Sequence, residues 1–555
     1  MSRPRRPAAV VVRFLAGLAS LSAFFYYYGH AQVLLYGDAV AHINIARRAF
    51  DSRTPGPLQL GTVWLPLPHL VIMPFVVSDA AWQSGLLASL PSMLAYVLAV
   101  LGVFRLLRDS LPASAGGAKA RDMAAIFGAA VFGANPNLLY LQATAMTEAL
   151  YLALFVWSVV YAGDCLRALS SDELEGAGKP LLHCCLCLAG AMLTRYDGWF
   201  SAGVIVFILL LVGARRLRAL RTARSATQAF AAARLLKAMA LAVLIVVAVP
   251  ALWMTYNAVV FGNPLNFLNG PYSARGIAQR TSPGNFHHPG YHDLWVALLY
   301  YVKAVELNLA NGWWEKIWLL AAAGGAFIGL RSLRMRPLVL LWVPVPFYVL
   351  SIAYGDVPIF VPQWWPQSYY NLRYGLELLP AVGVFSAIAL YAALSSRNLT
   401  SRWTMVIAAC AFIFAALSYA GIWRAQPICL QEAVVNSRTR VPFETELAAQ
   451  LDRLPPSATI LMYIGDHVGA LQRAGIPLRR IIHEGNHGDW KHALAKTGLW
   501  EQALAQPERM ADYAVAFDDD AVSHSAHEHH LTAVVVVETL GQPRATIYQT
   551  HPWPR

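Results

Sequence analysis

Asp38 and His42 stand one helical turn apart in the stretch GDAVAHINIARRAF, residues 37–50. At 100° per residue both fall on the apolar side of a predicted short helix, which should be packed, whereas Asn44, Arg47 and Arg48 fall on another arc. An aspartate can cap a helix start, and a histidine on a packed face can be an ordinary buried side chain. The pair therefore has both a structural and a chemical interpretation.

Four further charged residues occur at three places where apolar runs begin or end. Glu148 closes NPNLLYLQATAMTE at the start of such a run, where a carboxylate suits a helix N-terminus. Arg195 and Asp197 lie in LTRYDGW, and Arg373 with Tyr374 opens the run NLRYGLELLP. A guanidinium can hold a phosphate or carboxylate through two hydrogen bonds. The same residues could also be anchors at a membrane boundary.

The composition of the chain is that of a membrane protein. The chain has 555 residues, of which 57% are hydrophobic and 13% charged, against about 25% charged in soluble proteins. Repeated apolar runs of about 20 residues predict a polytopic α-helical membrane protein. The first run lacks an A-x-A cleavage site, so we expect it to be retained. We expect about eleven spans, at 8–28, 81–104, 122–135, 147–166, 180–195, 198–214, 238–258, 313–331, 337–354, 374–395 and 402–423.

The net charge of +12 is first a topology signal, because arginine and lysine favour cytoplasmic loops. Their distribution predicts a cytoplasmic N-terminus and, with an odd number of spans, an extracytoplasmic C-terminus. The outer loops are then 29–80, 135–148, 257–311 and 356–374. The run LWVALLYYVKAVELNL in the third loop has the pattern of an interfacial helix. We find no basic, aromatic-studded soluble face, which argues against nucleic-acid binding.

The chain divides at about residue 425. Residues 1–425 form the predicted membrane domain, and residues 430–555 alternate strand-like and helix-like segments, as in a small α/β domain. In that tail, Asp518 to Asp520 and the histidines 524, 527, 529 and 530 look like metal motifs, but a solvated strand end and a polar loop are the simpler interpretations. The six cysteines predict no disulfide framework.

The segments GDAVAHINIARRAF, WLPLPH, MTEALYLALF, LTRYDGW, YNAVVFGNPL and RYGLELLP, in this order across residues 1 to about 425, resemble the GT-C superfamily. These are glycosyltransferases that use polyprenyl-phosphate sugars, of the protein-mannosyltransferase and aminoarabinose-transferase type. Each segment is weakly specific, and the order carries the resemblance. The tail is not diagnostic of the superfamily.

The resemblance implies inverting hexosyl or pentosyl transfer from a lipid phosphate to an acceptor hydroxyl or amine at the outer membrane face. Protein, lipid and glycan acceptors all remain open. It assigns the general base to Asp38. Arg373 and Arg195 would stabilise the leaving phosphate, and His42, Glu148, Asp197 and Tyr374 would line the substrate site. The localisation it implies is a bacterial inner or cell membrane.

This chain departs from the superfamily pattern after Asp38. Many relatives have a second acidic residue there, whereas here Ala39 follows and His42 stands one turn on. His42 could orient the base, contact phosphate or bind a metal. No cofactor is expected, although a divalent ion between Asp38, His42 and Glu148 is conceivable.

A polytopic transporter or lipid flippase is the alternative from another class. Transporters place charge near the bilayer midplane and often contain internal repeats. Here the charged groups gather at one predicted membrane face, and we find no repeat. The sequence identifies neither the sugar nor the acceptor.

Overall fold

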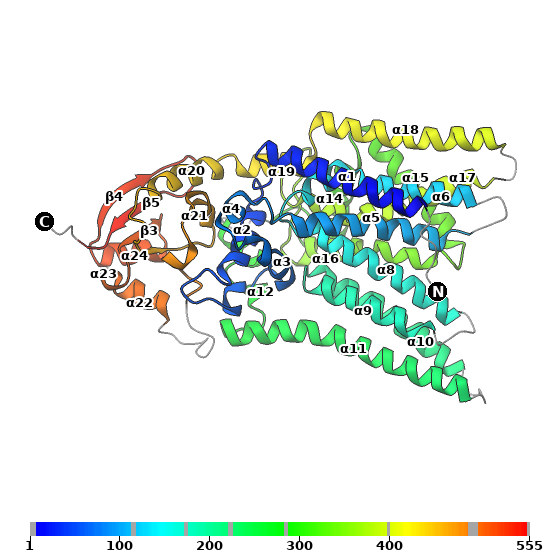
Figure 1. Ribbon diagram of the computed structural model, residues 1–555, viewed down its shortest axis with the longest axis horizontal. Helices are drawn as coiled ribbons and strands as arrows, with labels where there is room; N and C mark the ends of the chain where they lie inside the picture. The colour runs from blue at the N-terminus through cyan, green and yellow to red at the C-terminus, as the bar shows by residue number, and fades with distance from the viewer. Residues whose placement is uncertain are drawn as a thin grey trace.

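The protein consists of a helical bundle and a small sheet domain, with the first predicted outer loop between them (Figure 1). The computed structural model describes residues 7–112, 118–170, 176–219, 226–281, 287–396, 400–486 and 498–551. Several arginines that contribute to the predicted orientation lie outside these ranges, namely Arg3, Arg5, Arg6, Arg221, Arg224 and Arg397.

A helix is present at each predicted span. The bundle helices are α1 (Pro7–Gly29), α5 (Leu90–Ser110), α6 (Ala118–Gly133), α8 (Glu148–Ser170), α9 (Gly178–Met192), α10 (Asp197–Ala219), α11 (Ala226–Phe261), α15 (Trp313–Leu330), α16 (Pro344–Tyr354), α17 (Leu379–Leu394) and α18 (Ser401–Ala425). Within the described residues, eight spans are long and apolar enough to cross a membrane. A ninth is counted if α6 and α7 (Pro136–Gln142), bent by 61°, form one span. The prediction of a polytopic helical membrane protein is confirmed.

One sequence expectation needs correction here, and a second is refined. The predicted span 81–104 begins only at Leu90, because α4 (Asp79–Ser84) is a separate helix that ends at Gly85 with φ of 66°. The predicted interfacial run forms α14 (Leu294–Leu309), which packs on α16 and on the 3-10 helix η5 (Leu372–Leu378). Ala297, Tyr301 and Ala304 are fully buried there. Protein covers only this side of the helix, because Leu294, Trp295 and Leu299 remain exposed, so the interfacial position stays a prediction.

The first outer loop is built from short helices. They are α2 (Gly37–Arg48), η1 (Pro57–Leu60), α3 (Pro66–Ile72), η2 (Met73–Val76) and α4, and α12 (Asn266–Asn269), α13 (Ala274–Thr281) and η4 (Arg336–Trp342) complete the connections. Proline occupies the first turn of η1, α3 and η2, where its missing N–H costs nothing.

Helix α2 is buried on both sides, which the sequence did not predict. Its Asn44 side chain donates to Gln472 Oε1 at 2.7 Å and accepts from Trp82 Nε1 at 2.9 Å. Arg47 pairs with Asp51 at 2.8 Å and with Asp79 at 2.5 Å. The polar arc is thus satisfied by protein partners rather than by water, and α2 has little freedom to move.

The C-terminal domain is a mixed α/β unit, as predicted. It follows α19 (Ile428–Ser437) and α20 (Arg440–Leu451), and contains β1 (Ile460–Met462), α21 (Val468–Ala474), η6 (Leu478–Arg480), β2 (Ile481–Ile482), α22 (Leu499–Ala505), α23 (Pro507–Met510), β3 (Tyr513–Phe517), α24 (Ala521–Glu528), β4 (Thr532–Val537) and β5 (Ala545–Gln549). The strand order is β2-β1-β3-β5-β4, parallel from β2 to β3 and antiparallel from β3 to β4.

The acidic run of this domain has a structural role. The Asp520 side chain caps α24 by accepting from Ser523 N at 2.7 Å, whereas the Asp519 side chain is 92% exposed. This agrees with a strand end that is partly solvated.

Asp51 joins the C-terminal domain to the loop that carries α2. Its carboxylate accepts from Arg479 Nη1 at 3.0 Å and from the backbone N–H groups of Leu478 and Arg479 at 3.3 Å, in addition to Arg47. The side chain is only 3% exposed. This single carboxylate therefore bridges two parts of the molecule that are more than 400 residues apart in sequence.

We expect Asp51→Ala to loosen this junction. The substitution leaves buried Arg47 with Asp79, which is 61% exposed, as its carboxylate partner and removes the acceptor of the Leu478 and Arg479 N–H groups, which together costs about 3 kcal/mol. The apparent melting temperature in detergent should fall, and limited proteolysis between α19 and β1 should accelerate. Asp519→Ala, at an exposed aspartate, is the matched control. Equal behaviour of the two variants would contradict the role given to Asp51.

Candidate active site

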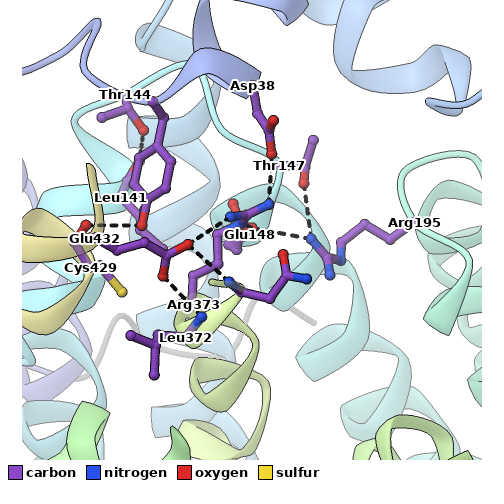
Figure 2. A network of polar contacts seen from close by, with 12 residues as sticks. Asp38, Leu141, Thr144, Thr147, Glu148, Arg195, Leu372, Arg373, Cys429 and Glu432 are labelled. Atoms are coloured by element: carbon purple, nitrogen blue, oxygen red, sulfur yellow. Dashed lines mark hydrogen bonds and ion pairs between the residues drawn. The ribbon is translucent and has the colours of Figure 1, made fainter. Parts of the chain in front are cut away.

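Arg373 lies at the centre of the site and pairs with three carboxylates (Figure 2). Its Nη2 donates to Asp38 Oδ2 at 2.6 Å, its Nε to Glu148 Oε1 at 3.0 Å, and its Nη1 to Glu432 Oε1 at 3.2 Å. The three acids come from α2, from the start of α8 and from α19. One guanidinium thus links segments from the whole length of the membrane domain and from the helix after it.

The backbone around Arg373 is fixed by hydrogen bonds and close packing. Asn371 adopts a left-handed conformation with φ of 57°. The N–H groups of Asn371 and Leu372 donate to the Glu432 carboxylate at 3.0 and 2.9 Å, so Glu432 holds the backbone as well as the side chain of this segment. The Asn308 amide donates to Leu372 O at 2.7 Å. Gly375 packs so closely on α14 that a Cβ would lie 2.4 Å from Ala304 O.

Arg195 forms a second centre beside the first. Its guanidinium donates to Asp197 at 3.1 Å, to Glu148 at 3.2 Å and to the Tyr348 hydroxyl at 2.9 Å. Glu148 Oε1 therefore accepts from both arginines. The ring of Tyr374 lies 5.0 Å from the Arg195 guanidinium carbon and 5.1 Å from that of Arg373, a cation–π geometry on both sides.

Exposure separates Asp38 from the other acids of the site. Among the described carboxylates that pair with the two arginines, the Asp38 side chain is 36% exposed, whereas the exposed fractions of the others do not exceed 2%. These others are Glu148, Asp197, Glu377 and Glu432. A base must reach its proton at about 2.6–3.2 Å. Asp38 is thus the acid of this group that an arriving substrate can touch.

His42 lies next to this centre and pairs with a second histidine. Its Nδ1 is 2.9 Å from Nε2 of His69, and its ring packs against Trp64. Burial lowers the pKa of His42 to about 4, although the Asp38 and Glu148 charges oppose this shift. Burial also lowers the pKa of His69, and His42 adds to that effect. Both imidazoles are therefore neutral at physiological pH.

Two guanidinium groups face five carboxyl groups here, so the centre is rich in acid. Even so, no group of three or more His, Cys, Asp or Glu side chains in the described part of the chain is arranged to hold a metal ion. Between Asp38 and Glu148 the structure places the guanidinium of Arg373. The positive charge that a divalent ion would supply at that point comes from a side chain.

Most of the residues singled out from the sequence come together. Asp38, Glu148, Arg195, Asp197, Arg373 and Tyr374 form one network, and His42 lies beside it. Sequence reasoning missed Glu377, Glu432 and His69. Glu377 stands one turn after Arg373 in an apolar run, which was a usable signal. Glu432 follows the last span at a position that nothing in the local sequence distinguishes.

Comparison with solved structures identifies the fold. The chain aligns with ArnT from Cupriavidus metallidurans bound to undecaprenyl phosphate over 97% of its own length and 98% of that chain, with a TM-score of 0.54 and 14% identity. The apo state of the same ArnT gives 0.54 and 13% identity over 97% of each chain. No protein-family model and no curated protein matches the sequence. ArnT is a GT-C glycosyltransferase, so the GT-C-like fold expected from the sequence is confirmed.

Gly375→Ala should disturb the site through packing alone. The added methyl group would collide with the α14 backbone at Ala304, and overpacking of this kind costs about 1–3 kcal/mol. We expect a lower apparent melting temperature and a displaced Arg373. Gly324→Ala is the control, because a Cβ at Gly324 meets nothing within 4 Å. An unchanged melting temperature for Gly375→Ala would show that the α14 contact is not tight.

Acid should destabilise the protein partly through His42. The folded protein binds fewer protons than the unfolded chain between pH 4 and pH 6.5, since the His42 pKa falls from 6.5 to about 4. This contribution to stability is complete above pH 6.5 and is lost as the pH falls toward 4. His42→Gln should therefore show a smaller drop in melting temperature between pH 7 and pH 4. A wild-type drop that His42→Gln leaves unchanged would contradict this assignment.

Proposed function

We propose that this protein is an integral-membrane inverting glycosyltransferase. It moves a hexosyl or pentosyl group from a polyprenyl-phosphate donor to an acceptor hydroxyl or amine at the outer membrane face. The observation that carries the proposal is the partly exposed Asp38 carboxylate 2.6 Å from the Arg373 guanidinium. The fold of ArnT, a structure of which contains undecaprenyl phosphate, supports the class of donor.

Asp38 suits proton removal from the acceptor, and Arg373 suits stabilisation of the leaving phosphate. Asp38 removes the proton of the acceptor hydroxyl or amine, whose electron pair forms the new bond to the anomeric carbon. The bond from that carbon to the phosphate oxygen breaks on the opposite face of the sugar, which inverts the configuration. The lipid phosphate leaves with the bonding electrons, and the guanidinium of Arg373 stabilises the charge that develops on it.

Donor binding activates Asp38 because the donor phosphate replaces its carboxylate as the partner of Arg373. Without donor, the Asp38 carboxylate and Arg373 Nη2 neutralise one another. A phosphate oxygen that takes Nη2 releases the carboxylate and leaves it charged beside the reacting sugar. Glu148 and Glu432 continue to hold Nε and Nη1, so Arg373 keeps its orientation during the exchange.

The remaining residues of the network position Asp38 and Arg373. Glu148 joins Arg195 to Arg373, and Asp197 with Tyr348 holds Arg195 in place. Tyr374 covers both guanidiniums. Neutral His42, paired with His69, supports the wall behind Asp38 without adding charge.

The predicted topology completes the proposal. The N-terminus is cytoplasmic and the C-terminal domain extracytoplasmic, in a bacterial inner or cell membrane. The donor head group then reaches Asp38 from the outer leaflet. The acceptor, a protein, lipid or glycan, arrives from the same side.

Asp38→Asn separates catalysis from binding. With labelled polyprenyl-phosphate sugars as donors, we expect turnover, as transfer or as donor hydrolysis, to fall roughly 10²- to 10⁴-fold, the usual contribution of a positioned base. Binding of undecaprenyl phosphate should be retained, because an amide competes less well than a carboxylate for Arg373. Arg373→Gln should instead weaken undecaprenyl-phosphate binding.

Asp519→Asn, at an exposed aspartate far along the chain, controls for a general loss of charge. Full turnover by a folded Asp38→Asn variant would disprove the base assignment. If the wild-type protein binds no undecaprenyl phosphate, the class of donor is wrong.

A further inference from the structure

The ends of α5 and α8 that point away from the C-terminal domain (Figure 1) carry a second cluster of charged residues. A cavity of about 930 Å³ opens there between α1, α5 and α8. Glu148 and Arg167 mark the two ends of α8, and their separation of 19 residues corresponds to roughly 28 Å. This approaches the hydrocarbon thickness of a bilayer, about 30 Å. The cavity is therefore at the opposite membrane boundary from Asp38.

One end of this cavity is strongly basic. Its lining includes Arg13, Arg105, Arg108, Arg121, Arg167 and Arg334. Among the described residues, three aspartates pair with them, namely Asp109, Asp122 and Asp164. These six arginines and three aspartates together carry a formal charge of +3. Nη1 of Arg167 is buried and has no hydrogen-bond partner within the described part of the chain. The ion pairs hold the arginines in place without neutralising them as a group.

The other end of the cavity is apolar and faces the membrane. Its walls are Leu98, Leu101, Phe104 and Trp157. Leu98 is 42% exposed, and Trp157 is fixed by donating to Leu98 O at 2.9 Å. Ten residues of α5 separate Leu98 from Arg108, so the groove extends along the helix for about 15 Å. Its apolar part therefore lies at the depth of acyl chains and its basic part at the depth of head groups.

We propose that this groove binds an anionic glycerophospholipid, with the phosphate head group among the arginines and an acyl chain along α5 against Trp157. The change from apolar wall to basic end matches an amphiphile that lies parallel to the helices. Basic pockets between membrane helices bind anionic head groups in this way. A soluble anion would leave the apolar wall unused. Because the site is a helix length from Asp38, it does not depend on the proposed transfer reaction.

Trp157 allows a direct test. The full-length protein is placed in phosphatidylcholine nanodiscs that contain a small fraction of a lipid brominated in its acyl chains, either phosphatidylglycerol or phosphatidylcholine. Bromine quenches tryptophan fluorescence on contact. We expect brominated phosphatidylglycerol to quench more strongly at equal content. Trp157→Phe should remove the difference, which assigns it to the groove among the 17 tryptophans.

Charge removal tests the head-group end. Arg13→Gln and Arg108→Gln should each raise the phosphatidylglycerol content needed for half-maximal quenching, by roughly fivefold per charge. Arg402→Gln, an exposed arginine at the start of α18, is the matched control and should have no effect. Arg13 is itself exposed, so its substitution leaves the ion pairs of the groove intact.

Three results would overturn the proposal. Equal quenching by both brominated lipids would show that the groove does not select an anionic head group. If both arginine variants have wild-type melting temperatures and need the same phosphatidylglycerol content for half-maximal quenching, the arginines do not bind the head group. Inorganic pyrophosphate binding with the same arginine dependence, but without a difference between the lipids, would identify a site for a soluble anion instead.

Discussion

The arrangement of this protein depends on a buried guanidinium. Arg373 is enclosed by acids from α2, α8 and α19, and a buried charge persists only where partners compensate it. The first loop, the second loop and the helix after the last span must therefore meet at one point. Close packing around η5, including that of Gly375 on α14, helps to hold the Arg373 side chain in position.

The C-terminal domain contributes to the site through its junction with the bundle. Gln472 bonds to Asn44, and Asn486 bonds to Thr54 at 2.7 Å, so the domain holds both α2 and the segment that follows it. Glu432, from the connecting helix α19, supports the backbone of Arg373. The domain thus restrains the elements that carry the side chains of the candidate site, although its sheet supplies none of the described residues in the network.

The sequence was sufficient for the elements whose signals are local. Apolar runs identified the bundle helices, and boundary charges identified Asp38, Glu148, Arg195 and Arg373 as a group. It could not supply the partner of each charge, because pairing depends on tertiary packing across hundreds of residues. Glu432 shows this limit, since it is an acid in an ordinary helix until the fold sets it against Arg373. Likewise, the polar arc of α2 was predicted from periodicity, but its burial depended on Gln472 and Trp82.

The pairing of Asp38 with Arg373 also bears on the order of events in a catalytic cycle. A carboxylate held by a guanidinium is a weak base, so an acceptor that enters first meets a partner already engaged. In the proposed reaction, the phosphate of the donor lipid competes with Asp38 for the guanidinium. The proposed chemistry therefore favours ordered addition, donor before acceptor, and a return to the paired state when the spent lipid departs. The ion pair between Asp38 and Arg373, which stabilises the protein without substrate, would thus also prevent Asp38 from removing a proton before the donor is bound.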